Sequence, residues 1–255
     1  MSVTGTFGQH NSLGVYLSLA LGPAIGLGLE AKRHDRRLWA TASLLIWVGL
    51  LLTFSRGAWM GVGVAMGIGL ILARDTLWDW VKAHQSFSVL TLTLLIALCW
   101  RSPGHITTLS ARPYYWKAGI RVLRKHPVIG IGPGNYESQI RSYLSGPELV
   151  LFDFEMVQKG HIDFWQNLHN LYLQLGVEYG LIGLALWLFA MSLGIWRRGA
   201  DSAGDEGSPL KTCLWLSAIA FLVHNTLDIA TVNSFDLLFG TWLALSRSHR
   251  LSDPS

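Results

Sequence analysis

The chain has 255 residues, of which 51% are hydrophobic and only 14% are charged. Soluble domains carry about 25% charged residues, and the mean hydropathy here is +0.35, so most of this surface is not built to face water. The net charge of +4 does not indicate nucleic-acid binding, because excess Lys and Arg in a membrane protein mark cytoplasmic loops and no RNA- or DNA-binding motif is present. Cys99 and Cys213 lie in apolar runs and predict neither a disulfide framework nor a metal site.

Seven segments are apolar enough to predict membrane-spanning helices, each of which needs about 20 residues. The expected spans are 13–29, 38–54, 58–73, 87–100, 171–196, 214–229 and 235–245, of which the fourth and the seventh are short. Small residues recur every four positions in the third span, and such rows let helix backbones approach closely in lipid; they are Gly57, Gly61, Ala65 and Gly69, then Gly63 and Gly67. The predicted fold class is all-α: a polytopic transmembrane bundle of about seven helices with a partly helical extracytoplasmic loop.

Basic residues orient this predicted bundle. They lie in the first, third and fifth connections and in the C-terminal tail, for example Lys32, Arg74, Arg197 and Arg247. These four regions fall on one side when seven helices alternate, and the positive-inside rule makes that side the cytoplasm. We therefore expect three parts: four helices in residues 1–101, an extracytoplasmic segment in residues 102–168, and three helices in residues 169–255.

The N-terminus falls outside in this topology. Residues 1–12 are too polar for a signal peptide, which needs a charged region followed by an apolar one. We therefore expect this chain to be the C-terminal part of a longer protein that has an odd number of helices upstream.

Arg56 lies in the short connection between the second and third predicted helices. An ionisable residue at the membrane edge is a candidate for function, although an arginine that snorkels into the headgroups is an equally good explanation.

Residues 111–127 predict an amphipathic helix on the membrane surface, with Pro113 in its first turn. Its apolar stripe contains Trp116, Ile120 and Leu123, and its basic stripe contains Lys117, Arg121 and Arg124. Arg112 precedes this helix, where free backbone N–H groups favour anions. Anchoring to anionic headgroups explains the basic stripe but explains Arg112 less well.

Two further motifs follow in the outer segment. Residues 129–136 are rich in glycine, including Gly132 and Gly134, which suits either a turn or a close backbone approach to a ligand. His169 then stands at the entry to the fifth predicted helix, where Gly176, Gly180 and Gly183 are expected to continue one helical face below it.

The sixth predicted helix ends in a polar cluster on the same side, formed by His224 and Asn225 before Asp228. This cluster could line the same cavity, but a helix cap is the preferred interpretation.

Together these motifs resemble the O-antigen ligase and polymerase superfamily of membrane glycan-assembly proteins. The resemblance depends on His169-Asn170, which is followed after nine residues by Gly180 and after two more by Gly183. Segments 4–11, 54–57, 112–116 and 130–135 match further family landmarks in order. One departure is that family members have more helices than the seven expected here.

The resemblance implies a metal-independent glycosyltransferase without a cofactor, in the bacterial inner membrane, with its active site facing the periplasm. Its donor would be a polyprenyl-diphosphate-linked glycan, usually undecaprenyl-linked, and its acceptor a glycan, lipid or protein. Arg56 and Arg112 would bind the donor diphosphate with Arg121 as a further candidate, and His169 would activate the acceptor hydroxyl. We further predict Asn170, Glu178, Gly132, Gly134 and His224 as supporting residues; for Glu178, a second base or orienting partner and a helix-packing role are equally good interpretations.

The residue types agree with this chemistry. Arginine binds phosphate oxygens bidentately and stays charged, and histidine accepts a proton near neutral pH. Two other functions remain open: a transporter, which would need polar groups near the bilayer midplane, and a non-catalytic assembly subunit.

Overall fold

The computed structural model describes residues 4, 9–72, 106–159, 167–201, 208–229, 239–241 and 244–245. These residues form helices and contain no strand, which confirms the all-α fold class. The helices are α1 (His10–Glu30), α2 (Arg36–Leu52), α3 (Arg56–Leu72), α6 (Ile106–Lys125), α7 (Tyr136–Gln139), the 3-10 helix η2 (Ile140–Tyr143), α8 (Pro147–Lys159), α9 (Leu171–Asp201) and α10 (Pro209–His224).

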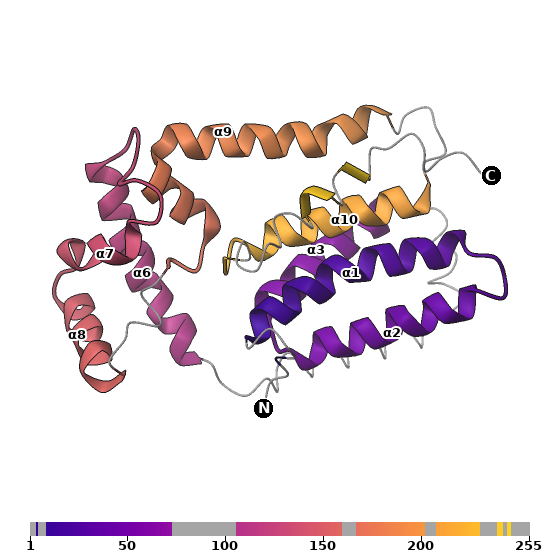
Figure 1. The fold of residues 1–255 in the computed structure, drawn as a ribbon, viewed down its shortest axis with the longest axis horizontal. Coiled ribbons are helices and arrows are strands. Elements are labelled where there is room, and N and C mark those ends of the chain that lie inside the picture. Colours follow the sequence, from indigo (N-terminus) through magenta and orange to yellow (C-terminus); the bar gives the residue numbers. More distant parts are fainter. Residues whose placement is uncertain are drawn as a thin grey trace.

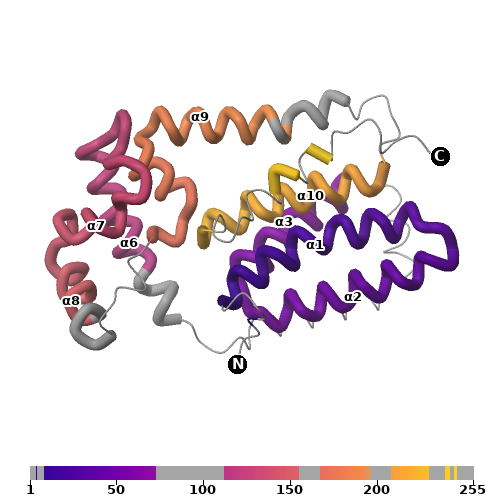
Figure 2. The backbone as a smooth tube through the Cα atoms, in the orientation of Figure 1, coloured from indigo at the N-terminus to yellow at the C-terminus, as the bar shows by residue number. Residues whose placement is uncertain are grey.

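The helices form two regions, which Figure 1 shows side by side. The first, the bundle, consists of α1, α2, α3 and α10, which lie roughly parallel or antiparallel to one another. The second, the lobe, consists of α6, α7, η2, α8 and the first part of α9 (Figure 2). The remainder of α9 runs from the lobe alongside the bundle.

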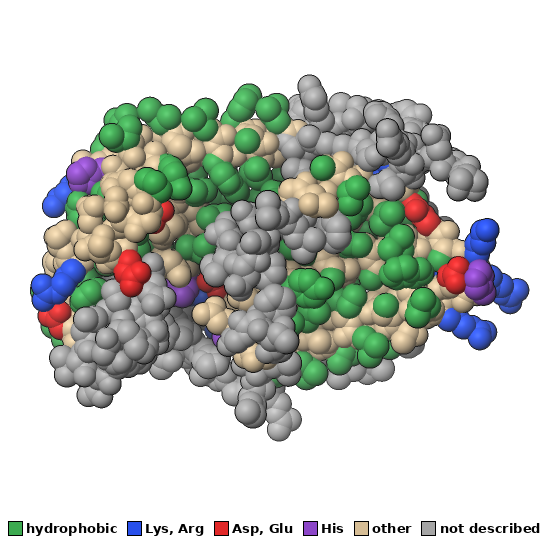
Figure 3. Space-filling model, viewed as in Figure 1, with side chains coloured by type: hydrophobic (Ala, Val, Ile, Leu, Met, Phe, Trp, Pro, Cys, Tyr) green, Lys and Arg blue, Asp and Glu red, His purple; other side chains and the backbone are tan. Residues whose placement is uncertain are grey.

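Among the described residues, two helices are long and apolar enough to cross a membrane, α1 and residues 171–193 of α9, and α3 and α10 are shorter apolar helices. Many large apolar side chains on the outside of the bundle and of α9 are exposed, including Leu45, Ile71 and Phe189. Figure 3 shows apolar side chains in patches along α9 and over the bundle. Apolar surface on this scale suits lipid rather than water.

The predicted count of seven spans stays a prediction. Spans 38–54 and 58–73 correspond to α2 and α3, and α10 ends at His224 rather than continuing to 229. Span 87–100 lies outside the described residues, and only 239–241 and 244–245 of the last span are described.

Glycines set how closely the bundle helices approach one another. A Cβ atom added to Gly61 of α3 would lie 2.3 Å from the carbonyl oxygen of Ala220 in α10. One added to Gly22 of α1 would lie 2.4 Å from the carbonyl oxygen of Cys213 in the same helix α10. These contacts bear out the predicted small-residue row that contains Gly61. In contrast, Gly63 and Gly67 of the second row face open space.

The lobe has a hydrophobic core of its own. Helix α6 contributes Tyr115, Ala118 and Val122, which pack against side chains of the other lobe helices, among them Tyr136. The stripe predicted from Trp116, Ile120 and Leu123 is therefore displaced by about one residue, and Ile120 is exposed. The reason is the approach of Leu168 to Gly119, where an added Cβ would lie 2.8 Å from the leucine side chain.

The start of α6 also differs from the prediction. The helix begins at Ile106, so Pro113 lies within it rather than in its first turn. Its apolar face is buried in the lobe, and it is therefore not the face that would lie on a membrane surface.

Helix α9 is broken at Gly180, whose φ of 70° lies in the left-handed region. The prediction that Gly180 continues a helical face is therefore wrong. The break leaves backbone groups without helical partners, and residues 127–132 supply them. The amide of Leu181 donates to the Pro127 carbonyl at 2.7 Å, and the amide of Ile131 donates to the Val177 carbonyl at 3.0 Å. A Cβ at Gly180 would lie 2.1 Å from the Val128 carbonyl oxygen, so only glycine fits there.

Candidate active site

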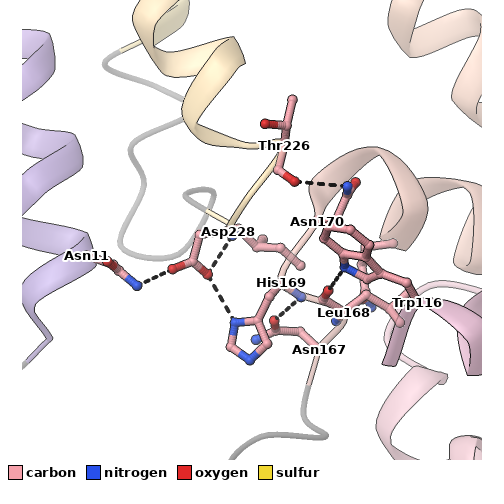
Figure 4. Close-up of polar contacts among 10 residues, drawn as sticks. Asn11, Trp116, Asn167, Leu168, His169, Asn170, Thr226 and Asp228 are labelled. Atoms are coloured by element: carbon pink, nitrogen blue, oxygen red, sulfur yellow. Dashed lines mark hydrogen bonds and ion pairs between the residues drawn. The ribbon is translucent and has the colours of Figure 1, made fainter. Parts of the chain in front are cut away.

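Polar side chains from four helix ends, and one from within α6, meet where the bundle joins the lobe. His169 precedes α9, and Asp228 follows α10. Figure 4 shows the His169 ring directed at Asp228, which lies between that ring and Asn11 of α1. Arg56, the first residue of α3, and Arg112 of α6 are charged neighbours in the same region. These residues are far apart in sequence and are brought together by the ends of their helices.

The backbone at His169 is held in an unusual conformation. Its φ is 47°, in the left-handed region that residues with a Cβ rarely adopt. The carboxamide oxygen of Asn167 accepts the His169 amide at 2.9 Å. The Leu168 carbonyl accepts the Trp116 indole N–H at 3.0 Å, and the Leu168 amide donates to Gln174 at 3.0 Å. Such strain persists only where the surroundings impose it, and here hydrogen bonds on both sides do so.

Asp228 connects His169 to α1. Its Oδ1 lies 3.2 Å from His169 Nδ1 and also accepts the Ile229 amide at 2.9 Å. Its Oδ2 accepts a hydrogen bond from the Asn11 carboxamide. The side chains of His169 and Asp228 are only 22% and 14% exposed, so the pair is largely shielded from water.

Two arginines and a second histidine border this pair. Burial lowers the pKa of the Arg112 guanidinium below its ordinary value; Asp228 opposes this shift and the charge of Arg56 adds to it. His224 is buried and lies against Gly57, the second residue of α3. It interacts electrostatically with both Asp228 and Arg112. The predicted residues Arg56, Arg112, His169 and His224 are therefore brought together.

Asn170 serves the local structure of this junction. Its Nδ2 donates to the Thr226 carbonyl at 3.0 Å, and its Oδ1 accepts the Leu173 amide at 3.0 Å in the first turn of α9. The Leu171 amide donates to the Asn225 carbonyl at 2.9 Å. These bonds fix the start of α9 against the end of α10, and with it the position of His169.

Three predicted supporting residues lie elsewhere. Glu178 is about two helical turns beyond His169, where its carboxylate accepts from Gln174 at 2.6 Å. The amide of Gly132 donates to the Glu178 carbonyl at 2.9 Å. Gly132 and Gly134 both have positive φ. The glycine-rich loop thus docks on the broken part of α9 and is not brought to His169.

Arg121 is not brought to the cluster either. It lies nine residues after Arg112, about half a turn away around the axis of α6. Its guanidinium pairs with the carboxylate of Glu148, and its Nε donates to the Tyr143 carbonyl at 2.9 Å. Burial tends to raise the pKa of Glu148, but the hydrogen bond from Arg121 and one from the Ser145 amide outweigh it and lower the pKa.

The described residues contain no group of three His, Cys, Asp or Glu side chains placed to hold a metal ion. What the cluster offers instead is a pair of cations beside a histidine–carboxylate pair. Such a set can bind an anionic group and exchange a proton next to it.

Two comparisons place this chain among known proteins. The sequence profile of the O-antigen ligase family matches residues 41–188, which is more than half of the chain. The exopolysaccharide production protein ExoQ of Rhizobium meliloti (strain 1021) is 25% identical over 256 residues, which cover 93% of this chain and 57% of that relative. The chain therefore spans little more than half the length of ExoQ.

The chain belongs to the O-antigen ligase family. The resemblance inferred from the sequence is confirmed. The range matched to the O-antigen ligase family contains Arg56, Arg112 and His169. It ends before His224 and Asp228.

Sequence reasoning missed two members of the cluster in this O-antigen ligase family protein. The sequence favours a helix cap for the cluster that contains Asp228, and it marks Asn11 only as part of the N-terminal landmark. The signal for Asp228 was its position, since a carboxylate at the outer end of an apolar helix needs a partner. No sequence signal pairs Asn11 with Asp228, because their contact joins residues 217 positions apart.

Proposed function

We propose that this chain is a glycosyltransferase of the O-antigen ligase and polymerase type, which moves a glycan from a polyprenyl-diphosphate donor to an acceptor hydroxyl or amide. The observation that carries the proposal is the meeting of Arg56 and Arg112 with the His169–Asp228 pair. Membership of the O-antigen ligase family supports the general chemistry. The name of the relative ExoQ, an exopolysaccharide production protein, favours a surface glycan as the product.

The two arginines suit a diphosphate. Arg56 and Arg112 are close enough to repel each other electrostatically, although the attraction of Asp228 for Arg112 is the larger of these two effects. A bound dianion would relieve the repulsion and would gain bidentate hydrogen bonds from both guanidinium groups. Arg56 lies in the first turn of α3, where free backbone N–H groups add a further preference for an anion.

His169 suits the role of general base. Asp228 accepts from Nδ1, so Nε2 keeps its lone pair for the acceptor. In the proposed step the acceptor oxygen attacks the anomeric carbon of the donor sugar while its proton passes to Nε2. The bond from that carbon to the diphosphate oxygen breaks, and polyprenyl diphosphate leaves with the electron pair. His169 later releases the proton to water.

The arginines would stabilise the leaving group as its negative charge develops, which is the role a metal ion takes in other transferases. The proposal is therefore metal-independent. Its test is a chelator: EDTA should leave the transfer rate unchanged, and restoration of a lost rate by added Mg²⁺ would contradict it.

The proposed side of the membrane is the periplasm or exterior. The connection between α1 and α2 contains Lys32 and Arg33, and the first turn of α2 contains Arg36 and Arg37. Basic side chains gather at that end of the bundle in Figure 3, opposite the lobe. By the positive-inside rule the lobe and the cluster would face away from the cytoplasm, where a lipid-linked glycan would present its sugars.

The decisive experiment compares matched variants in native membranes supplied with a polyprenyl-diphosphate-linked oligosaccharide. His169→Ala should lower the transfer rate at least about 100-fold, and Arg112→Ala should do the same. The controls are His126→Ala and Arg141→Ala, two exposed residues of the lobe that should keep the rate. Normal transfer by His169→Ala and Arg112→Ala would refute the proposal.

The same membranes address the two alternatives. Uptake of a solute by reconstituted protein without any glycan donor would favour a transporter. Donor binding without turnover in the wild-type chain would favour an assembly subunit. The glycan profile of a deletion strain then identifies the acceptor class: loss of a capped glycan on lipopolysaccharide indicates a ligase, and loss of chain length indicates a polymerase.

A further inference from the structure

We infer that Asn11 is a positioning residue of this site: its carboxamide holds Asp228 as an ionised acceptor and thereby fixes which nitrogen of His169 carries the proton. The catalytic meaning of this inference rests on the proposed function, but the contact itself does not. With Asn11 in this role, the first turn of α1 belongs to the candidate active site.

The geometry gives the Asp228 carboxylate three N–H donors. Oδ1 accepts from His169 Nδ1 at 3.2 Å and from the Ile229 amide at 2.9 Å. Oδ2 accepts from the Asn11 Nδ2 amide group. An amide NH₂ group donates and does not accept, so a proton on Oδ2 would have no acceptor in front of it. With donors on both oxygens, the ionised form is favoured and the carboxylate cannot rotate freely.

This arrangement has a consequence for the imidazole. A fixed, ionised Asp228 requires a proton on Nδ1 of His169, which leaves Nε2 unprotonated in the neutral ring. Asn11 therefore acts through Asp228 to determine that Nε2 is the ring nitrogen that takes the proton of the glycan acceptor.

Asn11 is not needed to hold α1 in the bundle. Val15 and Leu19 lie one and two helical turns after Asn11, and both are fully buried against Ala218 and Phe221 of α10. Gly22 is in close contact with the backbone of the same helix. A polar side chain at the very end of α1, paired with a carboxylate from another helix, adds little to this packing.

The charge at position 11 also affects the balance around His169. Asp228 interacts electrostatically with His169, His224 and Arg112, and Arg112 interacts in turn with Arg56 and Tyr115. The neutral Asn11 leaves this balance unchanged. A carboxylate in its place would add a negative charge next to Asp228 and would compete with it for a proton.

The experiment uses the full chain in lipid nanodiscs, with ¹⁵N-labelled histidine and NMR of the ring nitrogens. His169→Gln identifies the His169 signals. We expect the Nδ1–H tautomer in the wild type and a mixture of tautomers in Asn11→Leu, which has the same size but no donor. Asn11→Asp, which replaces the donor with a charged acceptor, should likewise give a mixture of tautomers.

The control is Gln9→Glu, which adds the same charge at the exposed N-cap of the same helix. Gln9→Glu should keep the wild-type tautomer; the same Nδ1–H tautomer in Asn11→Asp and Asn11→Leu would overturn the inference. The leucine variant alone decides the tautomer if the aspartate variant does not fold.

The transfer assay separates this inference from the proposed function. Asn11→Leu should lower kcat about 10-fold or more with little change in KM for the donor, whereas a purely structural role would lower only the amount of folded protein. A wild-type chain that transfers no glycan would refute the proposed function, and the NMR result would still decide the role of Asn11.

Discussion

In the bundle, glycines bring the backbones of neighbouring helices into contact, whereas α6, α7 and α8 of the lobe pack large side chains around an enclosed core. In the bundle, Gly22 and Gly61 bring α1 and α3 into contact with carbonyl oxygens of α10. In the lobe, large side chains such as Tyr136 and Phe152 are buried and an arginine–carboxylate pair connects α6 to α8. This is the difference expected between a region that lipid surrounds and one that water surrounds, since lipid gives helices no hydrophobic reason to associate.

The candidate site lies between these two modes of packing. The bundle contributes the ends of α1, α3 and α10, and the lobe contributes Arg112 and His169. A rigid contact between backbones holds one half of the site, and a side-chain core holds the other. Substitutions in either region should therefore change the site through different observables.

The largest effect is expected from Gly61→Leu in the bundle. Any Cβ at this position meets the backbone of Ala220, which cannot move aside as a side chain can, so we expect a loss of more than about 3 kcal/mol and little folded protein. Gly63→Leu is the matched control, because Gly63 faces open space. Size-exclusion profiles and thermal unfolding in detergent should separate the two variants, and equal yields would show that backbone contact is not what holds the bundle.

The sequence predicted the two regions unequally. Apolar length and the four-residue spacing of small residues were enough to predict α1, α2, α3 and α10 and the close contact at Gly61, because these features repeat within one helix. The lobe core was less predictable, since Gly119 and Leu168 meet only through the path of the chain between them. The stripe on α6 was accordingly displaced, and the break at Gly180 was missed.

The residues of the candidate site were also predictable to different degrees. The sequence was enough to find Arg56, Arg112 and His169. Each is a polar residue next to an apolar segment or within a recognisable short motif on the predicted outer side. Arg121 could not be separated from them by sequence, because its partner Glu148 is 27 residues away. The contacts of Asp228 with His169 and Asn11 depend on how α1, α9 and α10 end next to one another.

The next largest effect is expected at the join between the regions, from Gly180→Ala. A side chain here has to adopt a left-handed φ and also contacts the Val128 carbonyl. We expect a loss of about 2–3 kcal/mol and release of residues 127–132 from α9. Gly176→Ala is the control, because its Cβ would make only ordinary contacts with leucine side chains and helix propensity favours alanine by about 1 kcal/mol. Hydrogen exchange of the Ile131 amide measures the release, and protection equal to that of the wild type would contradict it.

A smaller effect, restricted to the lobe, is expected from Glu148→Gln. The carboxylate is buried, but a third of the Arg121 side chain is exposed, so we expect about 2 kcal/mol rather than the 3–5 kcal/mol of a fully buried pair. Because the pKa of Glu148 is lowered on folding, its contribution is complete above the ordinary glutamate pKa of about 4.3. It is lost as the pH falls through the lowered value. Limited proteolysis of the lobe from pH 7 to pH 3 should show this loss in the wild type and a flatter response in Glu148→Gln.

The smallest effect, and one of opposite sign, is expected from Tyr136→Phe in the lobe core. The Tyr136 hydroxyl is buried without a hydrogen-bond partner among the described residues, and burial raises the pKa of this phenol. An unsatisfied buried hydroxyl costs about 1–3 kcal/mol, so its removal should leave the lobe as stable as before or stabilise it by about 1 kcal/mol. Tyr143→Phe is the contrast, because the Tyr143 hydroxyl bonds His126 at 2.8 Å and its loss should slightly destabilise the lobe. Equal destabilisation by both variants would mean that the Tyr136 hydroxyl has a partner after all, and the lobe core would then contain a polar contact where only packing is expected.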